Sequence, residues 1–248
     1  MTRPAKPAVP RLDRLLANLG YGSRREAQSL VAAGLVTLDG QTLLDGDFHV
    51  SVTPDLPFRM TVDGAPLDPP PPLTLILHKP LGVVCSHREP GRSIYELLPP
   101  RWARRDPALS TGGRLDKETS GLLLLTDDGA LLHRIISPKA GIAKRYCVTL
   151  ERPLTGDEGA LFASGAMMLA GDTKPLLPAA LEILGPNACR LTIAEGRYHQ
   201  VRRMFEAIGN VVTALHRDRI GGLDLPPDLP AGAYRVMRPD ELALVFGS

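Results

Sequence analysis

The sequence predicts an α+β protein with a small N-terminal α+β domain and a larger domain built on a mixed, largely antiparallel sheet. A chain of 248 residues suits one small and one larger domain. Four consecutive prolines, Pro69–Pro72, separate two differently patterned regions. After them, short apolar segments alternate irregularly with helical patterns. The absence of a βαβ rhythm and of a glycine-rich phosphate loop argues against a doubly wound nucleotide-binding fold.

The N-terminal region begins with a Pro-rich stretch, residues 1–10, which is expected to be a disordered tail. Leucines then recur at three- and four-residue spacing from residue 12 to residue 19, which indicates a helix. Gly20 and Gly22 end this pattern, and Ser23 with Glu26 forms the capping box of a second helix.

A hairpin is predicted after the second helix. The apolar segments 35–38 and 41–44 flank Asp39-Gly40, a pair typical of tight hairpin turns. The small domain is therefore expected over residues 11–58. Residues 59–72 are predicted to be a Pro-rich linker, and polyproline II, rising about 3.1 Å per residue, would make it a semi-rigid spacer. The larger domain then spans residues 73–248.

The larger domain is predicted to contain short strands and two helices. The helices are expected around residues 131–136 and 201–208, the second ending at Gly209-Asn210. The strand candidates are Leu73–His78, Leu122–Thr126, Tyr146–Leu150, Leu181–Leu184, Arg190–Ile193 and Val211–Leu215.

Charge is unevenly distributed although the net charge is only +2. Residues 1–34 carry six Lys or Arg against two acidic residues, and residues 190–219 carry six Arg against three. Two basic patches on a nearly neutral protein favour local contact with a polyanion, with solvated faces as the alternative.

The three cysteines, Cys85, Cys147 and Cys189, are widely spaced among apolar residues. This spacing fits neither a disulfide framework nor a zinc site, so buried free thiols are expected. No signal peptide or membrane-spanning run is present in the sequence, which predicts a cytoplasmic protein.

The segment from Gly113 to Gly129, GRLDKETSGLLLLTDDG, is the most informative motif. Arg114 and Asp116 lie in its turn-prone part, which leads into Leu122–Leu125, a predicted buried strand. A loop braced by a core strand can hold a carboxylate and an arginine rigidly at a cleft. For an isolated Arg-x-Asp pair, a structural ion pair would be the preferred interpretation.

The whole phrase resembles the catalytic signature of the RsuA-type family, the pseudouridine synthases of the bacterial ribosomal small subunit. Residues 78–85, 144–146 and 195–205 resemble the same family, and residues 11–40 resemble an S4 RNA-binding domain. The family usually has Asn at the position of His78, so His78 is expected to be partly buried and hydrogen-bonded to the backbone. The resemblance implies a pseudouridine synthase domain behind an S4-like domain.

The implied chemistry accounts for the residue types. Converting uridine to pseudouridine breaks the C1′–N1 bond, rotates the base and rejoins it through C5. No redox or phosphoryl-transfer step is involved, so neither a cofactor nor a metal is expected. One ionised carboxylate can start the reaction, and Asp116 is the predicted source. A guanidinium would keep it ionised in a dry pocket, with Arg202 as the expected partner and Arg114 as the alternative.

Tyr146 is the third expected catalytic residue. Its ring would stack on the flipped uracil, and its hydroxyl would act as acid or base at C5. Phosphate contacts would offset the cost of extruding the base from its stack. The expected substrate or RNA contacts are Arg114, Lys79, Lys144, Arg197, His199, Gln200, Arg203, Arg24 and Arg25, with Arg217 and Arg219 as further phosphate contacts.

The expected partner is ribosomal RNA, and a monomer is the default. Residues 191–210 and 215–225 resemble the family member that modifies uridine 516 of 16S rRNA, with a 23S target as the alternative. Free RNA and a pre-30S particle both fit as substrate. A non-catalytic assembly factor is disfavoured because Asp116, Tyr146 and Arg202 occur together. A nucleoside hydrolase would need paired carboxylates or a metal.

Overall fold

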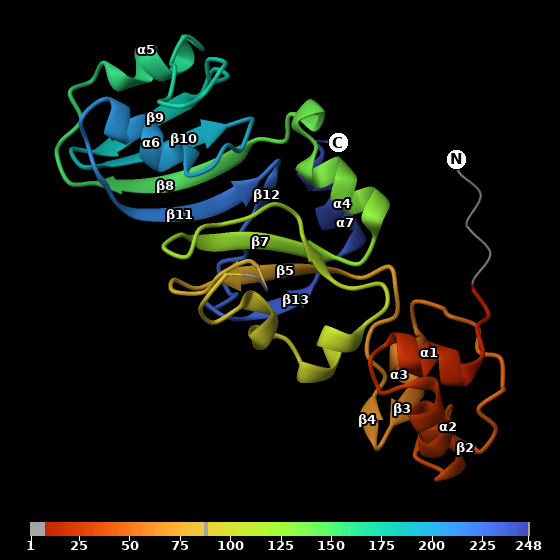
Figure 1. Ribbon diagram of the computed structural model, residues 1–248. Helices are drawn as coiled ribbons and strands as arrows, with labels where there is room; N and C mark the ends of the chain where they lie inside the picture. The colour runs from red at the N-terminus through yellow and green to blue at the C-terminus, as the bar shows by residue number, and fades with distance from the viewer. Residues whose placement is uncertain (1–7, 87–88, 248) are drawn as a thin grey trace. The chain divides into compact units, whose positions relative to one another are not determined.

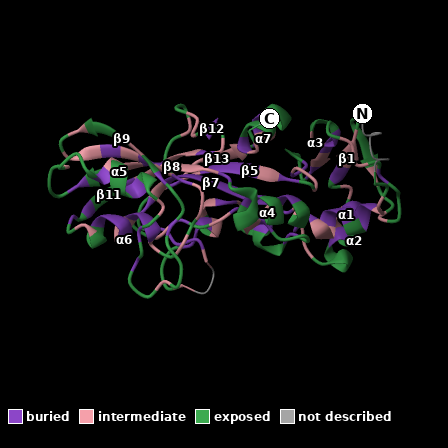
Figure 2. Cartoon of the chain, turned by 90° about the horizontal axis from the view of Figure 1, so that it is seen from above, coloured by how far each residue is buried: buried purple, intermediate pink, exposed green. Residues whose placement is uncertain are grey.

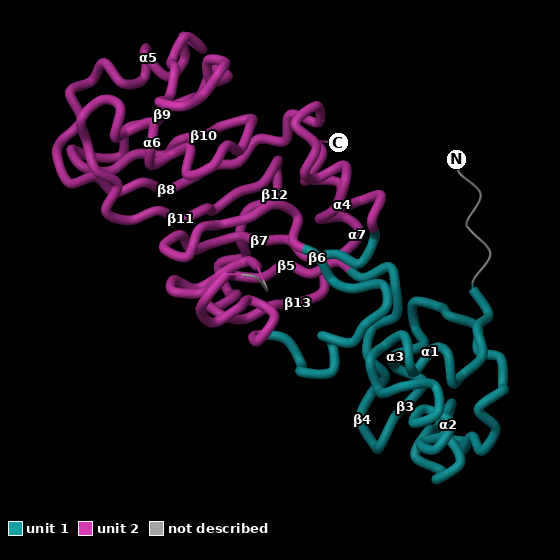
Figure 3. Tube along the Cα trace, in the orientation of Figure 1, with its two compact units in different colours: residues 1–73, 98–110, 126–128 teal, residues 74–97, 111–125, 129–248 magenta. Residues whose placement is uncertain are grey.

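The computed structural model describes residues 8–86 and 89–247 and divides into two compact units (Figure 3). The small unit comprises residues 1–73, 98–110 and 126–128, and the large unit comprises the rest. Residues 1–7 of the expected tail lie outside the described residues. Residues 8–10 are not a loose tail, because the Ala8 and Pro10 carbonyls accept hydrogen bonds from the amides of Val52 and Val50.

The small unit contains a four-stranded antiparallel sheet in the order β2-β1-β3-β4. Its apolar core joins leucines of both first helices to the inward positions of the sheet, such as Val36, Met60 and Val62. The elements are α1 (Leu12–Asn18), α2 (Arg24–Ala32), β1 (Val36–Leu38), β2 (Gln41–Leu43), α3 (Leu56–Arg59), β3 (Met60–Val62), β4 (Ala65–Pro66) and the 3₁₀ helix η2 (Pro100–Arg104).

The two local signals predicted in the small unit, the capping box and the hairpin turn, are both present. Ser23 Oγ accepts a hydrogen bond from the Glu26 amide at 3.3 Å, and the Glu26 carboxylate accepts one from the Ser23 amide at 2.7 Å, so the capping box is complete. Asp39 and Gly40 have φ values of 51° and 78°, which is the left-handed geometry of a type I′ hairpin turn between β1 and β2.

The predicted linker over residues 59–72 is wrong in its first part. Met60 and Val62 point into the core, and Asp63-Gly64 forms the turn between β3 and β4. Leu67 and Asp68 are also buried, and the Asp68 carboxylate accepts two hydrogen bonds from Arg101. Residues 60–64 alternate apolar and polar side chains and end in Asp-Gly, which is a hairpin pattern. The prolines that follow led to the prediction of a linker instead.

The large unit is built on a nine-stranded mixed sheet, with the path β13-β5-β7-β11-β8-β10-β9 (Figure 1). Strand β12 pairs with β11, and β6 pairs with β7. The strands are β5 (Thr74–Lys79), β6 (Ser110–Thr111), β7 (Ser120–Thr126), β8 (Lys144–Leu150), β9 (Ala180–Gly185), β10 (Ala188–Ile193), β11 (Val212–Ile220), β12 (Leu223–Asp224) and β13 (Tyr234–Val236).

The pairing is largely antiparallel, as predicted, with β7 and β11 parallel. Gly121 opposes Arg217 in that parallel pair. It has a φ of 115°, and a Cβ atom there would lie 2.2 Å from the Arg217 carbonyl oxygen. The close approach requires glycine, and it brings the segment after Asp116 against the backbone of β11.

Helices cover the large sheet. Figure 1 shows α4 and α7 beside each other, and Ile135 and Val245 from these helices share one apolar cluster with β7 residues. Helix α6 is amphipathic, with Val201, Met204 and Phe205 buried and its other face exposed (Figure 2). The helices are α4 (Gly129–Ile136), α5 (Glu158–Ala163), α6 (Gln200–Ala207) and α7 (Pro239–Val245), with 3₁₀ turns η1 (Ile94–Leu97) and η3 (Pro138–Ala140).

The six predicted strands and both predicted helices of this unit are present, although β11 runs on to Ile220. Strands β6, β12 and β13 and helices α5 and α7 were not predicted. The three cysteines are free thiols, with Cys85 and Cys189 buried and Cys147 partly buried. No helix in the described part of the chain has the length and apolar character needed to cross a membrane.

Candidate active site

The large unit contains a cavity of about 780 Å³ that gathers residues from distant parts of the sequence. Asp116, Tyr146 and Arg217 line it, from the loop before β7, from β8 and from β11. The turn before α6 contributes His199 to the same wall. Four segments far apart in the chain therefore converge on one space.

Asp116 lies on the loop between β6 and β7, and its side chain is one-third exposed to the cavity. The loop is closed by a hydrogen bond from the Thr119 amide to the Asp116 carbonyl at 3.0 Å. It then enters β7, whose leucines are fully buried. The carboxylate is accessible while the backbone that carries it is anchored in the core.

Lys79 binds the backbone of the same loop. Its side chain is fully buried, and its ammonium donates to the carbonyls of Thr119 at 2.7 Å, Pro80 at 3.1 Å and Lys117 at 3.3 Å. Burial lowers the pKa of Lys79. Lys79, which was expected to contact RNA, is buried here, and two of its three bonds hold backbone of the Asp116 loop.

Tyr146 forms part of the cavity wall and is 8% exposed. Its hydroxyl lies 3.5 Å from Arg217 Nη1, and the Arg217 guanidinium carbon is 6.0 Å from the ring centroid. Lys144, at the start of the same strand, also lines the cavity, and its ammonium donates to the Ile142 carbonyl at 2.9 Å. Burial, with Arg217 adding to it, lowers the pKa of Lys144.

Arg202 does not pair with Asp116 as expected. Its guanidinium donates to the carbonyls of Val212 at 2.9 Å and Glu118 at 2.7 Å, which ties α6 to the Asp116 loop through backbone. Arg114, the alternative, lines the cavity but forms an ion pair with Glu89. The sequence could not show which atoms Arg202 binds. Its guanidinium reaches the Glu118 carbonyl, two residues after Asp116, and not the Asp116 carboxylate.

His199 is the basic side chain that the described residues place within 4.0 Å of the Asp116 carboxylate, with Nε2 at 3.4 Å from Oδ1. Its backbone is left-handed, with φ of 49°, at the position preceding α6. Its ring stacks on the exposed Tyr198 ring, with centroids 3.8 Å apart. A left-handed non-glycine residue is a strained conformation of the kind that gathers at functional sites.

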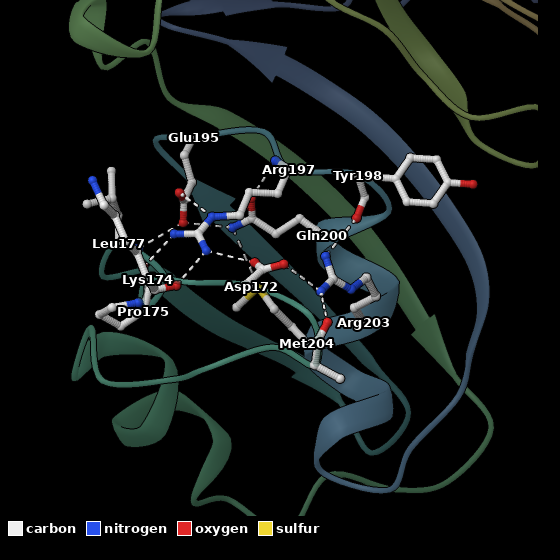
Figure 4. Close-up of polar contacts among 11 residues, drawn as sticks. Asp172, Lys174, Pro175, Leu177, Glu195, Arg197, Tyr198, Gln200, Arg203 and Met204 are labelled. Carbon is white, nitrogen blue, oxygen red and sulfur yellow. Dashed lines mark hydrogen bonds and ion pairs between the residues drawn. The ribbon is translucent and has the colours of Figure 1, made fainter.

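A polar network behind this turn fixes its geometry (Figure 4). Asp172 accepts hydrogen bonds from Arg197 at 2.7 Å and Arg203 at 2.8 Å, so one carboxylate bridges the two ends of the turn. Arg197 also binds Glu195 and the carbonyls of residues 174 and 175, and Arg203 binds those of residues 170 and 198.

Three residues that were expected to contact RNA take part in this internal network. Arg197 and Arg203 direct their guanidinium groups to internal partners. Gln200 is 3% exposed, accepts a hydrogen bond from the Arg197 amide and donates to Glu195. An acidic residue such as Asp172 could have been recognised in the sequence as a possible partner for the arginines near the start of α6. Only the fold shows that Asp172 binds both Arg197 and Arg203.

Arg217, which was expected to contact RNA phosphates, is only 1% exposed. Its Nε donates to the Leu122 carbonyl at 2.8 Å, across the parallel pair of β7 and β11. Leu215 and Arg217 are both buried and lie two residues apart on one strand, so period-two alternation in β11 could have placed Arg217 inward. Arg219, two residues further along, binds Asp224 at the surface.

His78 matches its prediction, with Nδ1 2.8 Å from the Leu229 carbonyl oxygen.

Known proteins resemble this chain over both units. A family model described as RNA pseudouridylate synthase matches residues 74–207, and the S4 domain model matches residues 10–53. The ribosomal small subunit pseudouridine synthase A of Escherichia coli strain K12 is 41% identical over 95% of this chain and 99% of its own. The Pseudomonas aeruginosa protein of the same name is 42% identical over 95% of this chain and 100% of its own.

A solved structure described as pseudouridylate synthase aligns with a TM-score of 0.67 and 36% identity, covering 95% of this chain and 99% of that one. The matches of sequence and of fold agree with the convergence of Asp116 and Tyr146 on one cavity. The chain belongs to the RNA pseudouridylate synthase family and is a pseudouridine synthase with an N-terminal S4 domain.

Proposed function

We propose that this enzyme converts uridine 516 of 16S ribosomal RNA to pseudouridine in the cytoplasm, acting as a monomer on free RNA or on a pre-30S particle. The observation that carries the proposal is the shared cavity of Asp116 and Tyr146. The choice of small-subunit RNA draws on relatives named for it that match 95% of the chain.

Asp116 is the proposed nucleophile or base, acting on the sugar or the uracil. It is one-third exposed at the cavity wall, while Lys79 and Arg202 hold the carbonyls of residues 117–119. A rigid loop keeps the carboxylate oriented as the base enters, so little reorganisation is needed. In this proposal Arg202 acts through the backbone of the loop, and His199 is the group beside the carboxylate.

Tyr146 is proposed to hold the flipped uracil and to move the proton at C5. Its ring is part of the wall, and its hydroxyl lies in a strongly cationic setting beside Arg217. Stacking on an aromatic ring contributes about 1–3 kcal/mol per base by alanine substitution. An acid or base at C5 would complete the isomerisation, since the proton that C5 loses is matched by one gained at N1.

The small unit is proposed to bind RNA phosphates through Arg24 and Arg25 at the start of α2. Both are exposed, and the guanidinium of Arg24 donates to the Asp13 carboxylate at 3.2 Å. The double variant Arg24→Ala, Arg25→Ala should bind 16S RNA less tightly, and its salt dependence should fall by about 0.7–0.9 in log–log slope per lost contact. Arg59→Ala is the matched control, because Arg59 is bound to Asp39 and Asp55.

These point variants are preferable to deleting residues 1–65. The Asp106 amide donates to the Asn18 carbonyl, and Gly20 lies against the Arg101 carbonyl, so residues 98–110 would lose their packing partners in the small unit.

The decisive test maps pseudouridine in ribosomal RNA from cells with and without this protein, and in RNA treated with the purified enzyme. Loss of pseudouridine at position 516 alone supports the proposal. A change in 23S RNA instead would redirect it to the large subunit, and no change anywhere would favour a binding factor. Asp116→Asn should abolish turnover while RNA affinity stays near wild type. Glu118→Gln, two residues away with its side chain outside the cavity, is the control.

A further inference from the structure

Arg217 carries a buried positive charge with an incomplete set of partners. It is 1% exposed, and Nη2 has no hydrogen-bond partner among the described residues. Its Nη1 contacts, to the Tyr146 hydroxyl and the Arg114 carbonyl, are both 3.5 Å long. Only the Nε bond to the Leu122 carbonyl, at 2.8 Å, is short. Removing a charge from water costs several kcal/mol unless a counter-charge and hydrogen bonds replace the water.

Arg105 is a second buried arginine, and its Nε and Nη1 also lack hydrogen-bond partners among the described residues, but it differs from Arg217 in having a counter-charge. Its side chain is 0% exposed, and it forms an ion pair at 3.2 Å with Asp127, which is equally buried. Arg217 has no carboxylate within 4.0 Å in the described part of the chain, and unlike Arg105 it lines the cavity. The missing counter-charge is therefore expected to come from what enters the cavity.

The neighbours of Arg217 make a negative occupant more favourable, because they are cations as well. Lys144 lines the same cavity, and Lys79 lies beneath the Asp116 loop. Arg217 acts electrostatically on both lysines. Asp116 and Glu118 both act on Lys79, but no carboxylate lies within 4.0 Å of Arg217 or Lys144 in the described part of the chain, so these two carry the excess positive charge. In a site that excludes water, such an excess strongly favours negative charge on a bound group.

We propose that Arg217 is a catalytic residue that donates to a carbonyl oxygen of the flipped uracil and stabilises its developing negative charge. This inference rests on the proposed function. When the C1′–N1 bond breaks, its electron pair goes to the base and is shared with O2 and O4. C5 then bonds to C1′, loses its proton, and N1 gains one, so the product is an isomer. Initial attack of Asp116 on C6 of the uracil ring would instead place charge on O4.

The test uses Arg217→Met and Arg217→Lys in the full-length enzyme, with Arg190→Met as the matched control. Arg190 lies on β10 of the same sheet and pairs with Glu182 at the surface. Removing one donor to a developing oxyanion lowers turnover by about 10²–10³-fold. Arg217→Met should show this loss, with nearly unchanged RNA affinity and a melting temperature equal to or above wild type, because an apolar side chain replaces an unpaired charge.

Arg217→Lys should turn over faster than Arg217→Met, because lysine keeps the positive charge. It should remain slower than wild type, because the ammonium does not occupy the position of the guanidinium. A second arm replaces O2 or O4 of the target uridine with sulfur, a weaker acceptor. Sulfur at the oxygen that Arg217 contacts should slow the wild-type enzyme by a larger factor than it slows Arg217→Met. This non-additivity identifies whether Arg217 contacts O2 or O4.

Wild-type turnover in Arg217→Met would overturn the inference. So would a fall in turnover that only follows a fall in melting temperature, with no recovery in Arg217→Lys and additive thio effects. If Arg217→Met does not fold, Arg217→Lys and the thio series still distinguish these outcomes. Failure of the wild-type enzyme to modify any ribosomal RNA would instead refute the proposed function, so the two failures are distinct.

Discussion

Asp172 lies outside the cavity, yet its substitution should impair catalysis. Its carboxylate joins Arg197 at 2.7 Å and Arg203 at 2.8 Å, which fixes both ends of the turn that carries His199 beside Asp116 (Figure 4). Asp172→Asn keeps the shape of the side chain but removes the charge and one acceptor.

The magnitude follows from the two bonds. Hydrogen bonds to charged groups contribute about 1.5–3 kcal/mol each. The three side chains keep between 15% and 25% of their exposure, so solvent screens part of this. Taking about 2 kcal/mol for the bridge, its loss changes the ratio of ordered to disordered turn by roughly 30-fold. We therefore expect turnover to fall by about 10-fold or more, with a smaller change in KM.

The assay is single-turnover conversion of 16S RNA, with thermal unfolding measured on the same samples. Asp224→Asn is the matched control, because Asp224 also bridges two arginines, Arg145 and Arg219, in the same unit but does not line the cavity. Equal turnover in Asp172→Asn and Asp224→Asn would refute the reasoning. Equal loss of melting temperature with a turnover defect only in Asp172→Asn would support positioning over general stability.

Three further outcomes are expected. Tyr146→Phe should bind RNA nearly as well as wild type but release product about 10²–10⁴-fold more slowly, and wild-type turnover would limit Tyr146 to stacking. Hydrogen bonding with Arg11 lowers the pKa of buried Asp13 to about 2 from 3.8, so its contribution of about 2 kcal/mol is present above pH 4 and lost as pH falls through 2. Denaturant unfolding of Asp13→Asn should accordingly differ from wild type at pH 6 and converge with it near pH 2, and a constant gap would contradict the pairing. Gly121→Ala should destabilise the fold by at least ~1 kcal/mol, because φ is 115° and the new Cβ would meet Arg217 backbone, whereas Gly129→Ala, with open space around it, should not.

Local signals in the sequence predicted most of the elements and the candidate catalytic residues. The capping box of Ser23 and Glu26, the Asp39-Gly40 hairpin and the four leucines after Asp116 each depend on neighbours close in the chain, so pattern and spacing predict them. The Asp116 motif and the S4-like segment predicted the family that the comparisons show. Local prediction failed at residues 60–66, where a proline run obscured a hairpin, and at the short elements β6, β12, β13, α5 and α7.

The tertiary structure alone decided which charged side chains are available. Lys79, Arg197, Arg203 and Gln200 were all plausible RNA contacts, yet each is bound by carbonyls or carboxylates. Those partners lie up to about forty residues away, or in a loop with no motif. The sequence does not distinguish a lysine or arginine that binds a phosphate from one that binds a carbonyl or a buried carboxylate. Burial and partner are set by which distant backbone segments the sheet brings together, and for Arg217 that was the parallel pairing of β11 with β7.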